Sequence, residues 1–111
     1  MALEDTTAQP GGMLLSAVSN SSVALMKKYY GRGPNSARTI IQRNYVVTFL
    51  SDIYTTLERT LIDTDQHETV KQTRLAFQRA MQTKFTAAVE EVMGRKVIAF
   101  LSQVHFDPDI S

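Results

Sequence analysis

Residues 37–50 read ARTIIQRNYVVTFL, and this stretch decides the fold. Its two halves, Ala37–Gln42 and Tyr45–Leu50, are rich in the β-branched and aromatic residues that favour strands. Arg43 and Asn44 between them suit a two-residue hairpin, because asparagine tolerates the positive φ that tight hairpin turns require. Both faces of the second strand carry apolar side chains. We therefore expect one face of the hairpin to meet helices, and another subunit is a candidate cover for the other face.

The residues before the hairpin have the spacing of an amphipathic helix that begins at Met13. The run from Gly31 to Ser36, GRGPNS, cannot continue a helix and predicts a tight turn. Residues 1–12 lack periodicity and end in QPGG. We therefore expect a flexible N-terminal tail followed by a single domain over residues 13–111.

A short helix is predicted after the hairpin, over Tyr54–Ile62, with Leu57 and Leu61 on one apolar side. A break follows it and leads into a second helix. Asp65 and Glu68 are spaced three residues apart at this point, as in a capping box with aspartate in place of the usual serine or threonine.

The second helix is predicted to run to about Met93, where Gly94 ends it. A stripe of apolar residues on this helix is expected to face the core, and it consists of Val70, Phe77, Met81, Phe85, Ala88 and Val92. A second apolar set, Leu75, Val89 and Met93, widens that face, so the helix is either well buried or in contact with another chain. The basic residues of this helix spread around the helical wheel and are expected at the surface; they are Lys71, Arg74, Arg79 and Lys84.

The last predicted element is a strand over Val97–Phe106, in which apolar and other side chains alternate. Asp107-Pro108-Asp109 then predicts a turn, after which the chain either ends or lacks a following strand. The elements follow the order helix, strand, strand, short helix, long helix, strand. We predict a single α+β domain whose mostly antiparallel sheet packs on helices.

The composition excludes several classes of protein. The 111 residues carry a net charge of +1, which argues against a strongly basic nucleic-acid binder. The chain has no cysteine, which removes disulfide scaffolds and thiol catalysis, and its two histidines are too far apart in sequence for a local metal motif. Neither a secretory signal nor a membrane-spanning run is present, so we expect a soluble, cytoplasmic protein.

The polar residues form no recognisable catalytic site. Carboxylate pairs at residues 63/65, 90/91 and 107/109 are explained by a helix cap, a solvated helix flank and a turn. The GRGP run follows a helix and precedes a strand, whereas a phosphate-binding loop needs the reverse order. We therefore predict that the protein is not an enzyme and binds no metal or cofactor.

Charge is distributed unevenly along the chain. No acidic residue lies between Asp5 and Asp52, so the first half of the chain is positive and the second half is negative. A basic patch over the end of the first helix, the glycine-rich turn and the hairpin is therefore a candidate functional surface. Tyrosines beside these cations are typical of single-stranded nucleic-acid binding, but an ordinary solvated surface is the favoured explanation of the cations. The basic residues in this interval are Lys27, Lys28, Arg32, Arg38 and Arg43.

Several stretches taken together resemble one known family. They are KYYGRGPNSAR at residues 28–38 with the hairpin that follows, LERTL at 57–61, VMGRKV at 92–97 and FLS at 100–102. From about residue 13 to residue 111 the chain is similar to the MpsC-like family of bacterial proteins. That family was formerly a domain of unknown function and is named after a component of a Na+-translocating membrane-potential-generating system. Its members continue into one more strand after the turn at residues 107–109, so the resemblance implies a sheet that is one strand short.

The resemblance implies a soluble accessory protein, because the family offers no catalytic motif and is associated with a membrane system linked to ion and inorganic-carbon uptake. We expect a membrane-protein partner, with no insertion of this chain into the bilayer. We also expect a homodimer that buries either the outer sheet face or the side formed by Leu75, Val89 and Met93. The candidate partner-binding residues are Gly31, Arg32, Gly33, Pro34, Arg38, Arg43, Gly94 and Arg95.

A small nucleic-acid-binding module is the alternative function. The predicted element order matches bacterial-type KH domains, which grip a nucleic-acid backbone with a Gly-x-x-Gly loop between two adjacent helices. In this chain the corresponding connection, residues 61–65, has no glycine and contains two aspartates that would repel phosphate. Nucleic acid is therefore not excluded as a partner, but it is not the favoured one.

Overall fold

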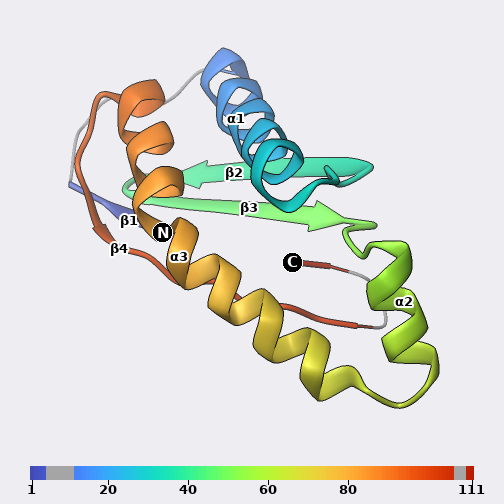
Figure 1. Ribbon diagram of the computed structural model, residues 1–111. Helices are drawn as coiled ribbons and strands as arrows, with labels where there is room; N and C mark the ends of the chain where they lie inside the picture. The colour runs from blue at the N-terminus through green and yellow to red at the C-terminus, as the bar shows by residue number, and fades with distance from the viewer. Residues whose placement is uncertain (5–11, 107–109) are drawn as a thin grey trace.

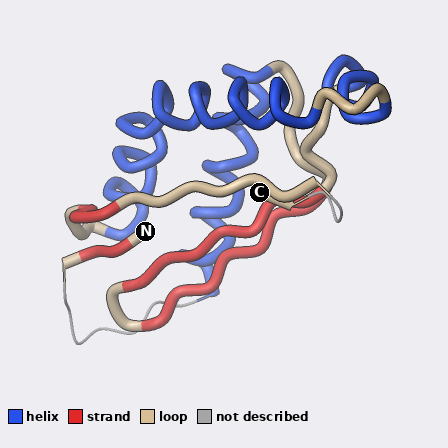
Figure 2. Tube along the Cα trace, turned by 90° about the horizontal axis from the view of Figure 1, so that it is seen from below, coloured by secondary structure: helices blue, strands red, loops and turns tan. Residues whose placement is uncertain are grey.

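The computed structural model describes residues 1–4, 12–106 and 110–111. Helices α1 and α3 lie on one side of the sheet, and the same two layers are seen from below (Figures 1 and 2). The predicted α+β class is confirmed. In order, the elements are β1 (Ala2–Leu3), α1 (Gly12–Tyr30), β2 (Ser36–Gln42), β3 (Tyr45–Ser51), α2 (Thr56–Asp63), α3 (His67–Met93) and β4 (Val97–Ala99).

The four strands form an antiparallel sheet in the order β2-β3-β1-β4. The predicted hairpin is confirmed, with β2 and β3 paired without a bulge from Ser36–Ser51 to Gln42–Tyr45. Its turn differs in one detail, because the residue with positive φ is Arg43, at 54°, and not Asn44. The hairpin is thus the longest pairing in the sheet, and the other elements are arranged around it.

The expected flexible tail over residues 1–12 is wrong for its first residues. Leu3 is fully buried, and the Glu4 N–H donates to the Lys96 carbonyl at 3.0 Å. These residues form the short strand β1 between β3 and β4. Periodicity cannot reveal a two-residue strand, because its position is created by two sheet edges that come from distant parts of the chain. The rest of that tail, residues 5–11, lies outside the described residues.

The expected strand over Val97–Phe106 is also wrong in its length. Only Val97–Ala99 is a strand, because its partner β1 is two residues long and offers no further edge. His105 pairs with Ile110 as an isolated bridge, and Ile110 pairs in turn with Ser51. The predicted turn at residues 107–109 lies outside the described residues.

Helix α2 turns only part of its predicted apolar side to the core, because Leu61 packs against the first core cluster whereas Leu57 does not. Leu57 is 70% exposed, whereas Glu58 is 5% exposed. The predicted capping box at Asp65 and Glu68 is wrong, since α3 begins without a side-chain cap. A capping box instead starts α2, where Thr55 Oγ1 accepts from the Glu58 N–H and a Glu58 carboxylate oxygen accepts from the Thr55 N–H. The capping box therefore orients the side chain of Glu58 through local contacts alone.

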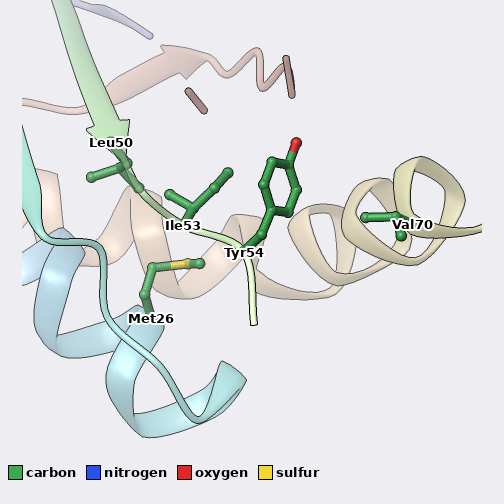
Figure 3. Packing of buried hydrophobic residues seen from close by; sticks show 5 residues of the cluster. All are labelled: Met26, Leu50, Ile53, Tyr54 and Val70. Carbon is green, nitrogen blue, oxygen red and sulfur yellow. The ribbon is translucent and has the colours of Figure 1, made fainter. Parts of the chain in front are cut away.

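The buried apolar residues form two clusters between the helices and the sheet. The first includes Met26, Leu50, Ile53, Tyr54 and Val70 (Figure 3). The second joins β1, α1, β3 and α3, and it consists of Leu3, Val18, Val46 and Val89. Val89 is thus part of the core, so the α3 side that contains it is buried within the chain itself.

Candidate functional site

The glycine-rich turn after α1 folds back against that helix. Gly31 has φ of +91°, a left-handed conformation that favours glycine and ends the helix. A Cβ on Gly33 would meet Val23 Cγ1 at 3.4 Å and Lys27 Cγ at 3.5 Å, so the turn leaves little spare room beside α1. Pro34 is buried. Three of the candidate residues are therefore explained by the reversal of the chain.

Arg32 joins this turn to the loop after β3. Its guanidinium donates to the Tyr54 carbonyl at 2.5 Å and to the Asp52 carbonyl at 3.3 Å, and it lies 3.2 Å from the Asp52 carboxylate. Asp52 has φ of 55° and also pairs with Arg59 at 2.5 Å. Arg32 thus holds a strained loop in place, and its charge is already partly matched by Asp52.

A buried polar network lies next to this loop, between the end of α1, the start of α2 and the first half of α3. Arg74 is 1% exposed and donates to both carboxylate oxygens of Glu58, at 2.7 and 2.6 Å, and to the Ile53 carbonyl at 2.7 Å. Its guanidinium lies 4.0 Å from the ring centroid of Tyr30 and 5.1 Å from that of Tyr54. The Tyr30 hydroxyl donates to Glu58. This bidentate geometry satisfies a buried charge pair and connects three helices.

Ionisation in this network is set by competition between burial and hydrogen bonding. Burial alone would raise the pKa of Glu58, but hydrogen bonds from Arg74, Thr55 and Tyr30 outweigh it, so the pKa lies below its ordinary value. Burial and the hydrogen bond to Glu58 raise the pKa of Tyr30 well above its ordinary value. Glu58 is therefore held as a carboxylate and Tyr30 as a neutral phenol.

A second group of candidate residues lies at the other end of the hairpin. Gly94 has φ of 65° and ends α3, and its N–H donates to the Glu90 carbonyl. Arg95 donates to the Glu4 carbonyl at 3.1 Å and to the Arg43 carbonyl at 2.9 Å. Arg95 thus ties the hairpin turn to the N-terminal strand, whereas the side chain of Arg43 itself is exposed.

The sheet face opposite α1 and α3 carries exposed apolar side chains. Successive pairs across β2 and β3 on this face are Arg38–Phe49, Ile40–Val47 and Gln42–Tyr45. We call this surface the outer face. Its exposed apolar residues are Ile40 (44%), Tyr45 (60%), Val47 (43%) and Phe49 (44%). Arg38 lies at one end of these rows, and Arg43 lies at the other.

A protein-family model described as "Na+-translocating membrane potential-generating system (MpsC)" matches residues 11–111. The chain belongs to the MpsC family. No curated protein and no solved structure matches the chain. The resemblance expected from the GRGP and GRKV signatures is therefore confirmed at the level of the family.

The structure does not bring the eight candidate residues of this MpsC-family protein into one patch. Gly31, Arg32, Gly33 and Pro34 lie beside the loop after β3, while Arg43, Gly94 and Arg95 lie about seven residues of strand away, at the hairpin turn. Arg38 is between them on the outer face. Arg32 and Arg95 donate hydrogen bonds to backbone carbonyls. Among the eight candidate residues, the cations available to a partner are therefore Arg38 and Arg43.

Sequence reasoning missed the buried network in this MpsC-family fold. Arg74 was expected at the surface, which is wrong, because it lies on the buried side of α3 between Val70 and Phe77. Its spacing from those two residues follows the helical period, so the signal was present. A basic residue within an apolar stripe is expected to be buried only if an acidic partner is known. The partner of Arg74 is Glu58 on another helix, so the sequence of α3 alone did not show it.

Among residues 1–4, 12–106 and 110–111, no group of three or more His, Asp or Glu side chains is placed to hold a metal ion. Within the same residues, no helix combines the length and the apolar character needed to cross a bilayer.

Proposed function

We propose that this protein is a non-enzymatic, cytoplasmic accessory protein of a Na+-translocating membrane-potential-generating system, and that it docks on a membrane-protein partner. The family description supports the link to that system. The internal chemistry also favours a structural role, because the shifted pKa values of Glu58 and Tyr30 occur in a closed network between helices and not in an open cleft.

The outer face carries this proposal. Four apolar side chains stand there in adjacent rows, and no helix of the described residues covers them. Exposed apolar rows of this kind mark interaction surfaces. We assign the apolar centre, Ile40 with Val47, to a homodimer in which two outer faces pack together. Arg38 and Arg43 flank that centre and are the cations available to an acidic surface on the membrane partner.

The oligomeric state tests the first half of the proposal. We expect light scattering to give the mass of a dimer, and Val47→Asp to give the mass of a monomer, because the substitution would bury two like charges across the interface. Thr60→Asp, on the exposed side of α2, is the control and should leave the dimer intact. A monomeric mass for the unsubstituted protein would overturn the assignment of the outer face.

Co-purification with subunits of the membrane system tests the second half. We expect Arg38→Ala to reduce the amount of partner recovered about tenfold without changing the melting temperature, because Arg38 is exposed and bonds to no described side chain. Arg79→Ala, on exposed α3 surface, is the matched control. Arg32→Ala is not informative, since it also removes the bond to the Tyr54 carbonyl. Equal recovery with Arg38→Ala and with the control would contradict the role of this face.

One observation favours nucleic acid as a second candidate. Tyr29 is 43% exposed, and its ring lies 5.2 Å from Lys28 Nζ and 5.0 Å from Lys84 Nζ. The charges of Lys28 and Lys84 lower the pKa of Tyr29. An exposed aromatic ring close to two cations suits stacking of a single-stranded base. Binding of single-stranded RNA that weakens steeply with salt and is lost in Tyr29→Ala would support this function, whereas no binding at low salt would remove it.

A further inference from the structure

The four tyrosine hydroxyls of the chain differ in whether another enzyme can reach them. Tyr54 is 1% exposed, and its hydroxyl donates to the His105 carbonyl at 2.9 Å. The Tyr30 hydroxyl donates to a carboxylate in the buried network between the helices. Tyr29 and Tyr45 are exposed. These last two are therefore the tyrosines open to modification at the surface.

Tyr29 differs from Tyr45 in the cations around it. It lies in the last turn of α1, where Lys28 Nζ is 5.2 Å from the centroid of its ring. Lys84 Nζ, from α3, is 5.0 Å from the same centroid. The two helices pack against each other, so tertiary folding adds the second cation to the first (Figure 1). We call Tyr29, Lys28 and Lys84 the tyrosine–lysine cluster.

The positive charge of the tyrosine–lysine cluster is not matched within the chain. All three side chains are exposed, and neither ammonium group pairs with a carboxylate of the described residues. The charges of Lys28 and Lys84 lower the pKa of Tyr29, and Lys28 contributes more. Negative charge at the Tyr29 oxygen is therefore favoured, and two ammonium groups are free to bind an anion attached there.

We propose that Tyr29 is a phosphorylation site and that Lys28 and Lys84 hold the phosphate group once it is attached. A protein kinase and a nucleoside triphosphate supply the group. The Tyr29 oxygen forms a bond to the γ-phosphorus, the bond from that phosphorus to the leaving diphosphate breaks, and the hydroxyl proton passes to a base of the kinase. The products are phosphotyrosine at position 29 and a nucleoside diphosphate.

The charge of the cluster favours a phosphoryl group over the other groups that a tyrosine oxygen accepts. A phosphate monoester carries a charge of about −1.5 to −2 at pH 7 and has three acceptor oxygens, which match two ammonium groups. An acyl group adds no charge, and a nucleotidyl group, as a phosphodiester, adds only one. The phosphate monoester therefore gains the most from Lys28 and Lys84 together.

The position of Tyr29 on α1 sets a cost and a consequence. The negative end of the α1 dipole opposes an anion in the last turn, but Lys27 and Lys28 lie in that turn and offset it. The phosphate oxygens then accept from one helix through Lys28 and from the other through Lys84. We expect phosphorylation to tie the end of α1 to α3. The proposal does not rest on the accessory role, because α1 is on the opposite side of the sheet from the outer face.

Phosphorus NMR tests whether the cluster holds a phosphate. The sample is the full chain with phosphotyrosine incorporated at position 29, and the pH titration follows loss of the last phosphate proton. We expect this proton to be bound about tenfold more weakly in the folded protein than in the same protein unfolded in urea, because the ammonium groups stabilise the dianion.

One pair of variants assigns that difference to the cluster. Lys84→Gln should bring the folded and unfolded proton affinities within about threefold of each other. Lys71→Gln, on the exposed surface of the same helix, is the matched control and should leave the tenfold difference unchanged. Equal affinities in the folded and unfolded protein, or no change in Lys84→Gln, would overturn the proposal.

Mass spectrometry of the protein isolated from the cells that naturally produce it tests whether the site is used. We expect a fraction of the chains to carry one phosphoryl group on Tyr29, and Tyr29→Phe, which keeps the ring and removes the hydroxyl, to carry none at this position. Tyr45, which is 60% exposed without a described cation over its ring, is the internal control and should stay unmodified. No phosphate on Tyr29 in growing and in stationary cells, or as much on Tyr45 as on Tyr29, would overturn the proposal whatever the NMR titration gives.

Discussion

Helix α3 places two polar side chains one turn apart in two different environments. Arg74 has its guanidinium bonded to Glu58 and to the Ile53 carbonyl, whereas the Gln78 amide oxygen has no described partner. Both side chains are more than nine-tenths buried. The first lies where three helices close on each other, and the second lines a cavity of about 270 Å³ beside β3. We call the Arg74 site the closed end and the Gln78 site the open end. The buried polar groups have hydrogen-bond partners at the closed end, whereas at the open end one buried oxygen has none among the described residues.

The largest effect is expected at the closed end. Arg74→Met should lower the free energy of unfolding by about 3–5 kcal/mol, because it leaves the Glu58 carboxylate buried without its cation. Urea denaturation measures the change, and Arg79→Met on the exposed side of the same helix should change it by about 0.5 kcal/mol or less. The double variant Arg74→Met with Glu58→Leu should recover most of the loss. Equal stability of the two methionine variants would show that the network does not hold the helices together.

Shortening the Leu3 side chain in β1 should have the next largest effect. Leu3→Ala should lower the free energy of unfolding by about 2–5 kcal/mol, because Leu3 is fully buried against Val18, Val46 and Val89. Leu57→Ala removes the same atoms from a side chain that is 70% exposed and is the matched control. If thermal or chemical denaturation finds the two variants alike, the first residues do not belong to the sheet.

Acid should weaken the closed end selectively. The pKa of Glu58 in the folded protein lies below its ordinary value of 4.5. Its contribution to stability is therefore complete above about pH 4.5 and is lost as the pH falls through the lower, folded value. We expect the stability difference between the unsubstituted protein and Glu58→Gln to be constant from about pH 7 to about pH 5 and to shrink at lower pH. A difference that stays constant into the acid range would mean that Glu58 does not titrate with a lowered pKa.

The smallest effect is expected at the open end. Gln78→Leu should leave the free energy of unfolding unchanged or raise it by about 1 kcal/mol, because it removes an unpartnered buried oxygen and only a long hydrogen bond to Ser111. Chemical denaturation beside Arg74→Met makes the comparison on one helix. A loss of more than about 1 kcal/mol would show that the amide is well bonded in solution, and the two ends of α3 would then be alike.

The parts of the fold that depend on local pattern could be predicted from the sequence. The hairpin, the end of α1 at Gly31 and the end of α3 at Gly94 follow from alternation and from glycine in a left-handed conformation. The predicted apolar side of α2 is correct at Leu61 and wrong at Leu57, because the capping box and Arg74 draw Glu58 inward. A sequence pattern predicts that apolar side chains are buried and charged ones exposed. The buried ion pair of Glu58 and Arg74 is an exception to that rule.

The candidate site could be predicted only in part. Sequence pointed to the end of the first helix, the glycine-rich turn and the hairpin, with Arg32, Arg38 and Arg43, as one basic surface, and the family resemblance added Arg95 as a candidate. The structure shows that two of these arginines bond backbone carbonyls at opposite ends of the hairpin. Tertiary folding brings backbone carbonyls close to some arginines and not to others. The charges along the sequence therefore could not distinguish the bonded arginines from those that face solvent.

By itself, the sequence determined the family, the α+β class and the register of the hairpin, because each depends on residue types at short and fixed spacing. Only the tertiary structure decided that β1 joins the sheet, that Arg74 is buried on Glu58, and that Gln78 lines a cavity beside β3. These three features arise between residues 16 or more positions apart. Short-range pattern carries no information on which distant groups meet, and the packing of helices on the hairpin supplies it.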